Sequence, residues 1–125
     1  FVADYVDIHH IFPQKYCERQ GYDKRKWNCI VNKTPIAYRT NRKIGGVAPS
    51  KYLKAIEDTN VAAAALNANV ESHGIDVTSL RSDDFDKFFA FRAKTLLNLL
   101  TKAMGKRINN LDSTDVIEAF GMPLE

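Results

Sequence analysis

The chain has 125 residues, of which 45% are apolar and 26% are charged, and this size and composition are typical of one globular domain. No apolar run approaches the roughly 20 residues of a membrane-spanning helix, and the first residues do not resemble a signal peptide, so we expect a cytoplasmic protein with no membrane partner. Cys17 and Cys29 are too few for a disulfide framework and lack the CxxC spacing of a zinc site, so both are expected to be reduced thiols.

Charge is distributed unevenly along the chain. Residues 1–54 contain 11 Lys and Arg against 4 Asp and Glu, a net charge of +7, whereas residues 55–125 contain 7 against 11, a net charge of −4. A basic half beside an acidic half is typical of a domain that binds a polyanion on one side. A solvated surface with uneven charge explains the same numbers equally well.

The first half predicts two strands separated by a loop. Residues 2–11 are rich in β-branched and aromatic side chains and predict a strand. Residues 13–26 are polar, contain Gly21 and a basic cluster, and predict a long loop with at most a helical turn. Residues 27–32, WNCIVN, predict a second short strand.

A short helix is expected next, over residues 35–44. Thr34 followed by Pro35 is typical of a helix start, because Thr caps free N–H groups and Pro fits the first helical position. Gly45 and Gly46 are typical of a helix end. The first 46 residues therefore predict the order strand, loop, strand, short helix.

The second half predicts helices over residues 49–58, 60–74, 82–104 and 113–120. Asn60 is expected to cap the second of these, and His73, beside Gly74, is expected to make a C-terminal cap interaction there. The third helix carries an apolar stripe at the 3.6-residue period, which predicts core packing for Phe85, Phe88, Phe89, Leu96, Leu99, Leu100 and Ala103.

Two of the three histidines are adjacent, in the segment HHIFP at residues 9–13. Neighbouring side chains of a strand point to opposite faces, so His9 and His10 share one task only if the strand ends and the chain bends at that point. Pro13 favours such a bend.

Three signals follow one another in the basic half: HHIFP, then Asn28, then Asn41 with Arg42 and Lys43. Their order resembles the HNH endonucleases, and more closely the C-terminal HNH domain of GmrSD-type modification-dependent restriction endonucleases. The resemblance is strongest over residues 5–53. It implies a single α+β domain with a small ββα-metal core, a β-hairpin plus a short helix, over residues 1–46, and a mainly helical extension over 47–125.

The resemblance also implies a role for individual residues. His10 matches the catalytic histidine, the general base that takes a proton from the attacking water. His9 lies where many members carry a metal-binding Asp, and Asn41 matches the second metal ligand. Asn28 matches the middle Asn, which ties the loop between the strands and helps to orient the base, and Asn32 is a rival for that position.

A divalent ion is the expected cofactor. Mg²⁺ is favoured because a hard cation keeps several waters and takes a phosphate oxygen. A histidine in place of the usual Asp removes a negative charge, which would weaken binding of hard ions and shift preference toward Mn²⁺, Ni²⁺ or Zn²⁺. DNA is the expected partner, and its phosphates are expected to contact Lys24, Arg25, Lys26, Arg39, Arg42 and Lys43.

The leading hypothesis is a metal-dependent HNH endonuclease domain that hydrolyses DNA phosphodiester bonds, as the cutting module of a restriction or phage-defence protein. The alternative is a catalytically degenerate nucleic-acid-binding module, and a third hypothesis is a helical interaction domain in which residues 59–122 dock a partner. Phe1 in place of methionine suggests a fragment, whose further partner would be the N-terminal domain of the same longer protein. No Walker-type loop is present, so no nucleotide site is expected here.

Overall fold

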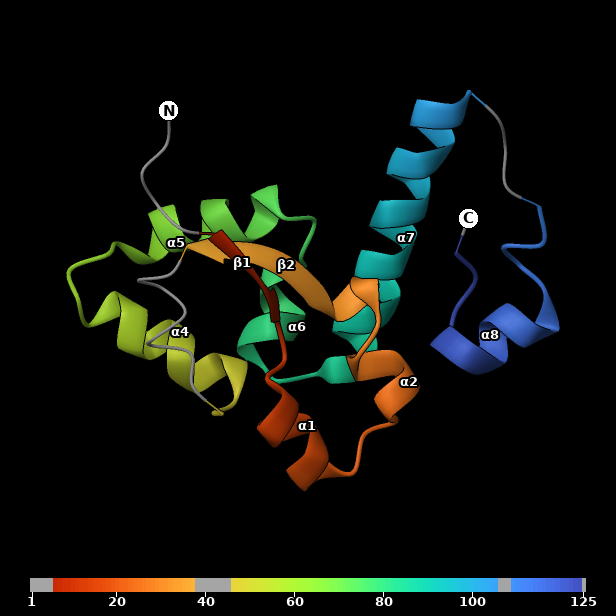
Figure 1. The fold of residues 1–125 in the computed structure, drawn as a ribbon. Coiled ribbons are helices and arrows are strands. Elements are labelled where there is room, and N and C mark those ends of the chain that lie inside the picture. The colour runs from red at the N-terminus through yellow and green to blue at the C-terminus, as the bar shows by residue number, and fades with distance from the viewer. Residues whose placement is uncertain (1–5, 38–45, 106–108, 125) are drawn as a thin grey trace.

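The computed structural model describes residues 6–37, 46–105 and 109–124 (Figure 1). Two strands, β1 (Val6–His10) and β2 (Lys33–Ala37), form an antiparallel ladder in which His9 lies opposite Thr34 and His10 lies opposite Lys33. Helices account for most of the remaining described residues, so the predicted α+β class with mainly helical content is confirmed.

The connection between the two strands is helical. It contains α1 (Gln14–Gln20), α2 (Lys24–Trp27) and the 3-10 turn η1 (Ile30–Asn32). The predicted long loop over 13–26 and the predicted strand over 27–32 are therefore wrong. In the segment that suggested a strand, Trp27 and Asn32 are buried, Cys29 and Val31 pack partly against the core, and Ile30 is 76% exposed, so the segment anchors α2 and η1 and does not pair.

Pro35 lies in β2, where it pairs with Ile8, and not at the start of a helix. Both strands of a two-stranded ladder are edges, and an edge tolerates a residue without a backbone N–H. The predicted helix over 35–44 is thus wrong at its start, and residues 38–44 of that prediction lie outside the described residues. β1 ends at His10, one residue before the predicted end, and the chain bends at Ile11 and Phe12.

The helices of the second half are α4 (Pro49–Glu57), α5 (Ala63–Ser72), α6 (Val77–Arg81), α7 (Phe85–Met104) and α8 (Thr114–Phe120). The predicted helices over 49–58 and 113–120 are confirmed. The helix expected over 60–74 is shorter than predicted, and Asn60 is not its cap, because the N-cap residue is Ala62.

The helix predicted over 82–104 begins three residues late. Asp83 adopts a left-handed conformation with φ +58°, which breaks the helix between α6 and α7. The carboxylate of Asp83 instead accepts hydrogen bonds from the backbone N–H and the hydroxyl of Ser50, at the start of α4. Asp84 caps α7 by accepting from the N–H of Lys87.

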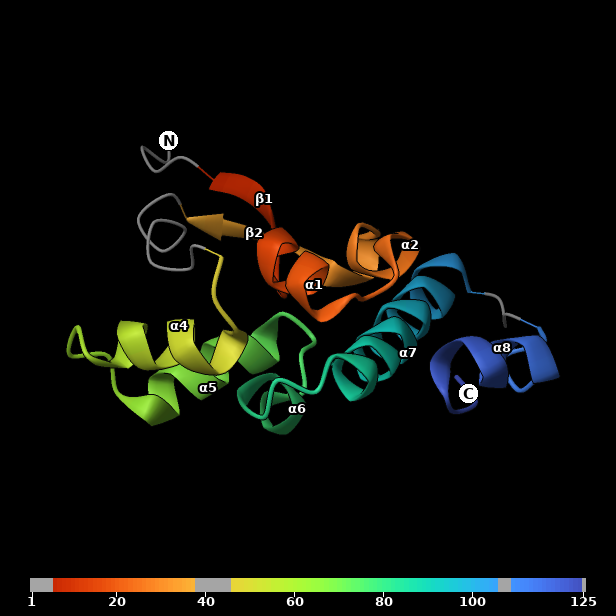
Figure 2. The same ribbon diagram turned by 90° about the horizontal axis from the view of Figure 1, so that it is seen from below.

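The elements form two layers (Figures 1 and 2). The ladder, α1 and α2 lie on one side, α4, α5 and α6 lie on the other, and α7 runs from between them toward α8. The core between the layers is aromatic, with Phe12 in contact with the rings of Phe85 and Phe88. The N-terminal turns of α7 thus provide most of the aromatic surface that covers the segment after β1.

The apolar stripe of α7 is buried only in its first half. Phe85, Phe88 and Phe89 are buried as predicted, whereas Leu96 is half-buried and Leu99, Leu100 and Ala103 are exposed, so the prediction of core packing for the last three is wrong. Leu99 is 57% exposed because α7 extends beyond the ladder and the layer of α4 to α6. Among the described residues no helix combines the length and the apolar character needed to cross a membrane.

Arg92 of α7 joins the helical half to the strands. Its side chain is 5% exposed and donates hydrogen bonds to four backbone carbonyls, those of Ile30, Val31, Lys33 and His73. Burial lowers the pKa of the guanidinium from its ordinary value, but arginine stays protonated in proteins. The guanidinium therefore satisfies carbonyl groups of η1, β2 and the end of α5 at the same time.

We expect Arg92→Met to lower the free energy of unfolding by about 3 kcal/mol, because the substitution leaves buried carbonyl groups without donors. Urea unfolding followed by circular dichroism measures the loss. Lys87→Met, on an exposed position of the same helix, is the matched control and should change stability by less than about 0.5 kcal/mol. Equal stabilities of the two variants would contradict the role of Arg92.

Cys17 and Cys29 should differ in reactivity. Cys17 is fully buried, and burial raises the pKa of its thiol from 9.0 to about 12, whereas Cys29 is half-buried. That rise leaves about 1000-fold less of the reactive thiolate at neutral pH. We expect iodoacetamide to modify Cys29 first and Cys17 only in urea, as measured by mass spectrometry of the digested protein. Equal labelling of both thiols in the folded protein would contradict this expectation.

Candidate functional site

The structure brings His10 and Asn28 together. The ring nitrogen Nε2 of His10 lies 3.0 Å from the side-chain oxygen Oδ1 of Asn28, although the two residues are 18 positions apart in the chain. The ring of His10 also lies edge-to-face on the indole of Trp27, with 5.5 Å between the centroids. An amide oxygen only accepts hydrogen bonds, so this contact places the proton of a neutral His10 on Nε2 and leaves Nδ1 as its basic nitrogen.

Buried residues next to His10 and Asn28 hold both in place. Phe12, two positions after His10, is fully buried, and Trp27, immediately before Asn28, is 4% exposed. Asn28 is the C-cap residue of α2, and its backbone N–H donates to the carbonyl of Lys24. The polar pair thus lies at the surface on two segments that are each anchored in the core.

Asn32 connects these two segments. It is fully buried, its Oδ1 accepts from the N–H of Phe12 at 2.8 Å, and its Nδ2 donates to the carbonyls of Phe12 at 3.0 Å and Trp27 at 2.8 Å. The backbone carbonyl of Asn32 accepts from the N–H of Ile11. One amide side chain therefore fixes the distance between the bend after His10 and the end of α2.

A further bond reaches this bend from α4. The hydroxyl of Tyr52, a buried residue whose pKa is raised by burial, donates to the carbonyl of Ile11 at 2.7 Å. With the bonds to Asn32, both N–H groups and both carbonyls of Ile11 and Phe12 have partners. The segment that follows His10 is therefore held in place by hydrogen bonds with residues of η1 and α4.

The two roles expected of the middle Asn are divided between two residues. Asn32 ties the segment between the strands to the bend after β1, and Asn28 contacts the imidazole. Sequence reasoning treated the two as rivals for one position, whereas the structure gives each a separate set of bonds. Tyr52 and Arg92 were not identified from the sequence, because a tyrosine and an arginine on amphipathic helices do not differ from ordinary boundary residues.

His9 belongs to a different group of side chains. It lies opposite Thr34 in the ladder, and the hydroxyl of Thr34 lies 2.8 Å from Nδ1 of His73, the C-cap residue of α5. The strand includes both His9 and His10, so the expected bend falls after the pair and not between its members. Alternation along the strand sends the two side chains to opposite faces of the ladder.

Of the two expected metal ligands, only His9 lies within the described residues; it is half-buried, with Nε2 shielded from solvent. Asn41, like Arg39, Arg42 and Lys43, lies outside them. Across residues 6–37, 46–105 and 109–124 there is no group of three or more His, Cys, Asp or Glu side chains that could hold a metal ion. The pair of His9 and Asn41 as metal ligands stays a prediction.

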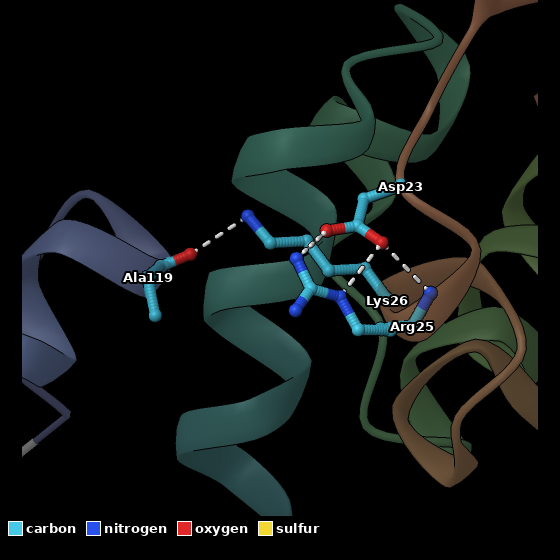
Figure 3. A network of polar contacts seen from close by, with 4 residues as sticks. All are labelled: Asp23, Arg25, Lys26 and Ala119. Carbon is cyan, nitrogen blue, oxygen red and sulfur yellow. Dashed lines mark hydrogen bonds and ion pairs between the residues drawn. The ribbon is translucent and has the colours of Figure 1, made fainter.

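The basic cluster on α2 is exposed in part and engaged in part (Figure 3). Arg25, 91% exposed, donates through Nε and Nη2 to the carboxylate of Asp23, and these bonds lower the pKa of Asp23. Lys26 donates to the carbonyl of Ala119 at 2.7 Å and thereby connects α2 to α8. Lys24 is exposed on the same helix.

Comparison with known proteins gives one short match. Over 49 residues the chain is 44% identical to the uncharacterized protein MJ0686 of Methanocaldococcus jannaschii, and these residues are 39% of this chain. The match covers only 8% of the length of that protein. No protein-family model matches the chain, and no solved structure matches it.

Asn32→Ala should lower the free energy of unfolding much more than Asn28→Ala does. Asn32→Ala leaves the N–H of Phe12 and the carbonyl of Trp27 without partners, and the carbonyl of Phe12 keeps only the thiol of Cys17, so we expect the free energy of unfolding to fall by about 3 kcal/mol. Asn28 is exposed, so its replacement should cost less than about 1 kcal/mol. Chemical denaturation of both variants gives the comparison, and a smaller loss for Asn32→Ala than for Asn28→Ala would contradict the assigned roles.

Proposed function

We propose that this chain is a metal-dependent HNH endonuclease domain that hydrolyses phosphodiester bonds in DNA. The observation that carries the proposal is the contact between His10 and Asn28, a histidine oriented by an amide at the rim of a rigid segment. The sequence supports the nuclease proposal in a second way, because HHIFP, Asn28 and Asn41 follow one another in the half of the chain that has a net charge of +7. We further propose that the domain is the cutting module of a restriction or phage-defence protein.

In this mechanism His10 acts as the general base. Its Nδ1 takes a proton from the water that attacks the phosphorus, while its Nε2–H donates to Asn28. The positive charge that develops on the ring is stabilised by the amide oxygen of Asn28. Asn28 also keeps the ring from rotating, so the basic nitrogen stays directed toward the substrate.

The family resemblance makes His9 and Asn41 the residues proposed to hold the divalent ion, with Mg²⁺ as the first choice and Mn²⁺, Ni²⁺ or Zn²⁺ as alternatives, although alternation along β1 directs the side chains of His9 and His10 to opposite faces of the ladder. When bound, the ion would stabilise the negative charge that develops on the phosphate and on the leaving oxygen. Exposed Lys24 and Arg25 are proposed to contact phosphates on one side of the scissile bond. Lys26, Arg39, Arg42 and Lys43 complete the proposed set of DNA contacts.

We expect His10→Ala to lower cleavage of plasmid DNA by at least about 100-fold, because the reaction loses its base. Asn28→Ala should lower kcat by between about 10- and 100-fold, because the imidazole loses its orientation. Agarose gels with Mg²⁺, Mn²⁺ or Ni²⁺, and with EDTA as the metal-free control, measure cleavage. Asn69→Ala, an exposed asparagine on α5, is the matched control and should cleave as the wild type does.

A gel shift in EDTA separates the chemistry from binding. Both site variants should bind DNA with nearly the affinity of the wild type, since neither substitution removes a cation. A His10→Ala variant that cleaves normally would refute the assignment of the base. Salt-sensitive binding without cleavage by the wild type, with any of the ions, would support the degenerate binding module in place of the nuclease.

A further inference from the structure

A hollow of about 570 Å³ opens on the ladder beside the pair of His10 and Asn28. We call it the isoleucine hollow, because Ile8 and Ile30 line it and are 64% and 76% exposed. Pro35 and Leu96 add further apolar surface, and Lys33 and Arg92 are its charged members. Its volume lies within the range of about 300–1,000 Å³ that is typical of sites for small organic groups.

Three of the residues that line the isoleucine hollow, Ile8, Lys33 and Pro35, lie on the same face of the ladder as His10, whereas Thr34, which also lines it, belongs to the other face. Ile8 precedes His10 by two positions, so both side chains point the same way and lie about 7 Å apart along the strand. Lys33 and Pro35 are the cross-strand partners of His10 and Ile8. On the other side of the hollow, Ile30 follows Asn28 by two positions, so the hollow is lined by residues close in the chain to both members of the pair.

The charge of the hollow limits what it can receive. Of the two cations among the described residues that line it, Arg92 is buried and bonded to four backbone carbonyls, so Lys33 is the one positioned to meet an anion, and these residues include no Asp or Glu. An apolar floor with a cationic rim is complementary to a flat organic group attached to an anion. A nucleotide has this combination, because its base packs against apolar side chains while its phosphate contacts a lysine.

We propose that the isoleucine hollow receives an unpaired nucleobase of the DNA strand that is cut. This inference rests on the proposed function and narrows it to a preference for single-stranded or locally unpaired DNA over intact duplex. Ile8 and Ile30 pack on the two sides of the base, and Lys33 contacts the phosphate between that base and the scissile bond. In duplex DNA the paired and stacked base does not reach the hollow without unstacking.

Fluorescence anisotropy in EDTA tests the proposal with three probes: a labelled single-stranded oligodeoxynucleotide, an abasic strand of the same length, and the corresponding duplex. The wild type should bind the base-bearing strand roughly tenfold more tightly than the abasic strand. The double variant Ile8→Ala/Ile30→Ala should lose this difference without a change in the salt dependence of binding, since no charge is removed. Both positions are exposed, so the variant is expected to fold, and circular dichroism checks this.

Ile117→Ala on α8, an isoleucine that is 41% exposed outside the hollow, is the matched control and should bind all three probes as the wild type does. Wild-type protein that binds the base-bearing and abasic strands equally, or a double variant that still distinguishes them, would overturn the proposal. The proposed nuclease is judged separately. Isoleucine-dependent binding without cleavage would refute the nuclease alone, whereas cleavage with no effect of the isoleucines would refute the hollow alone.

Discussion

The amide side chain of Asn32 is the constraint on which the candidate site depends. It closes a small network between the bend after β1 and the end of α2, and no water is needed to satisfy the polar groups that it joins. A buried polar group of this kind stabilises a fold only when every bond is made, and then it specifies one geometry. The geometry specified here is the distance between His10 and Asn28.

Arg92 and Tyr52 extend this constraint to the second layer. Each is a buried polar side chain on a helix of the second half, and each bonds to the backbone of the first half. Aromatic contacts of Phe12 with α7 supply the apolar part of the same interface. The helices therefore act as a support that keeps the ladder and α2 in register, and among the described residues the chemistry proposed for the site uses no helical residue after α2.

Sequence patterns predicted elements well where local chemistry and tertiary packing agree. Pro49 starts α4, Ser113 caps α8, and Gly105 ends α7 in the left-handed conformation, all of which are local effects. The strand expected over 27–32 and the helix expected from Pro35 failed because packing overrode propensity. The segment WNCIVN packs against the core through Trp27 and does not pair as a strand. β2 tolerates Pro35 because it is an edge strand, where a missing backbone N–H costs little.

The site was partly predictable for a related reason. His10 and Asn28 were predicted as site residues from a pattern of residue types. The separate roles of Asn28 and Asn32 depend on which of the two amides is buried. The sequence does not show which polar residue of an apolar run is buried. The exposed end of α7 shows the reverse case. Periodicity predicted burial for Leu99 and Leu100, yet periodicity reports only that a face is apolar and not that another element covers it.

The helical connection between β1 and β2 has a consequence for how the site assembles. The contacts that set the distance between His10 and Asn28 span 18 and 20 positions of the chain, and α1, α2 and η1 divide the segment between them into short steps. Bringing His10 to Asn28 costs conformational entropy of the chain between them. Formation of α1 and α2 divides this cost into several short loop closures in place of one long closure. The contact between His10 and Asn28 thus lies within one continuous segment, and the buried side chains of Tyr52 and Arg92 hold that segment in place from the second half of the chain.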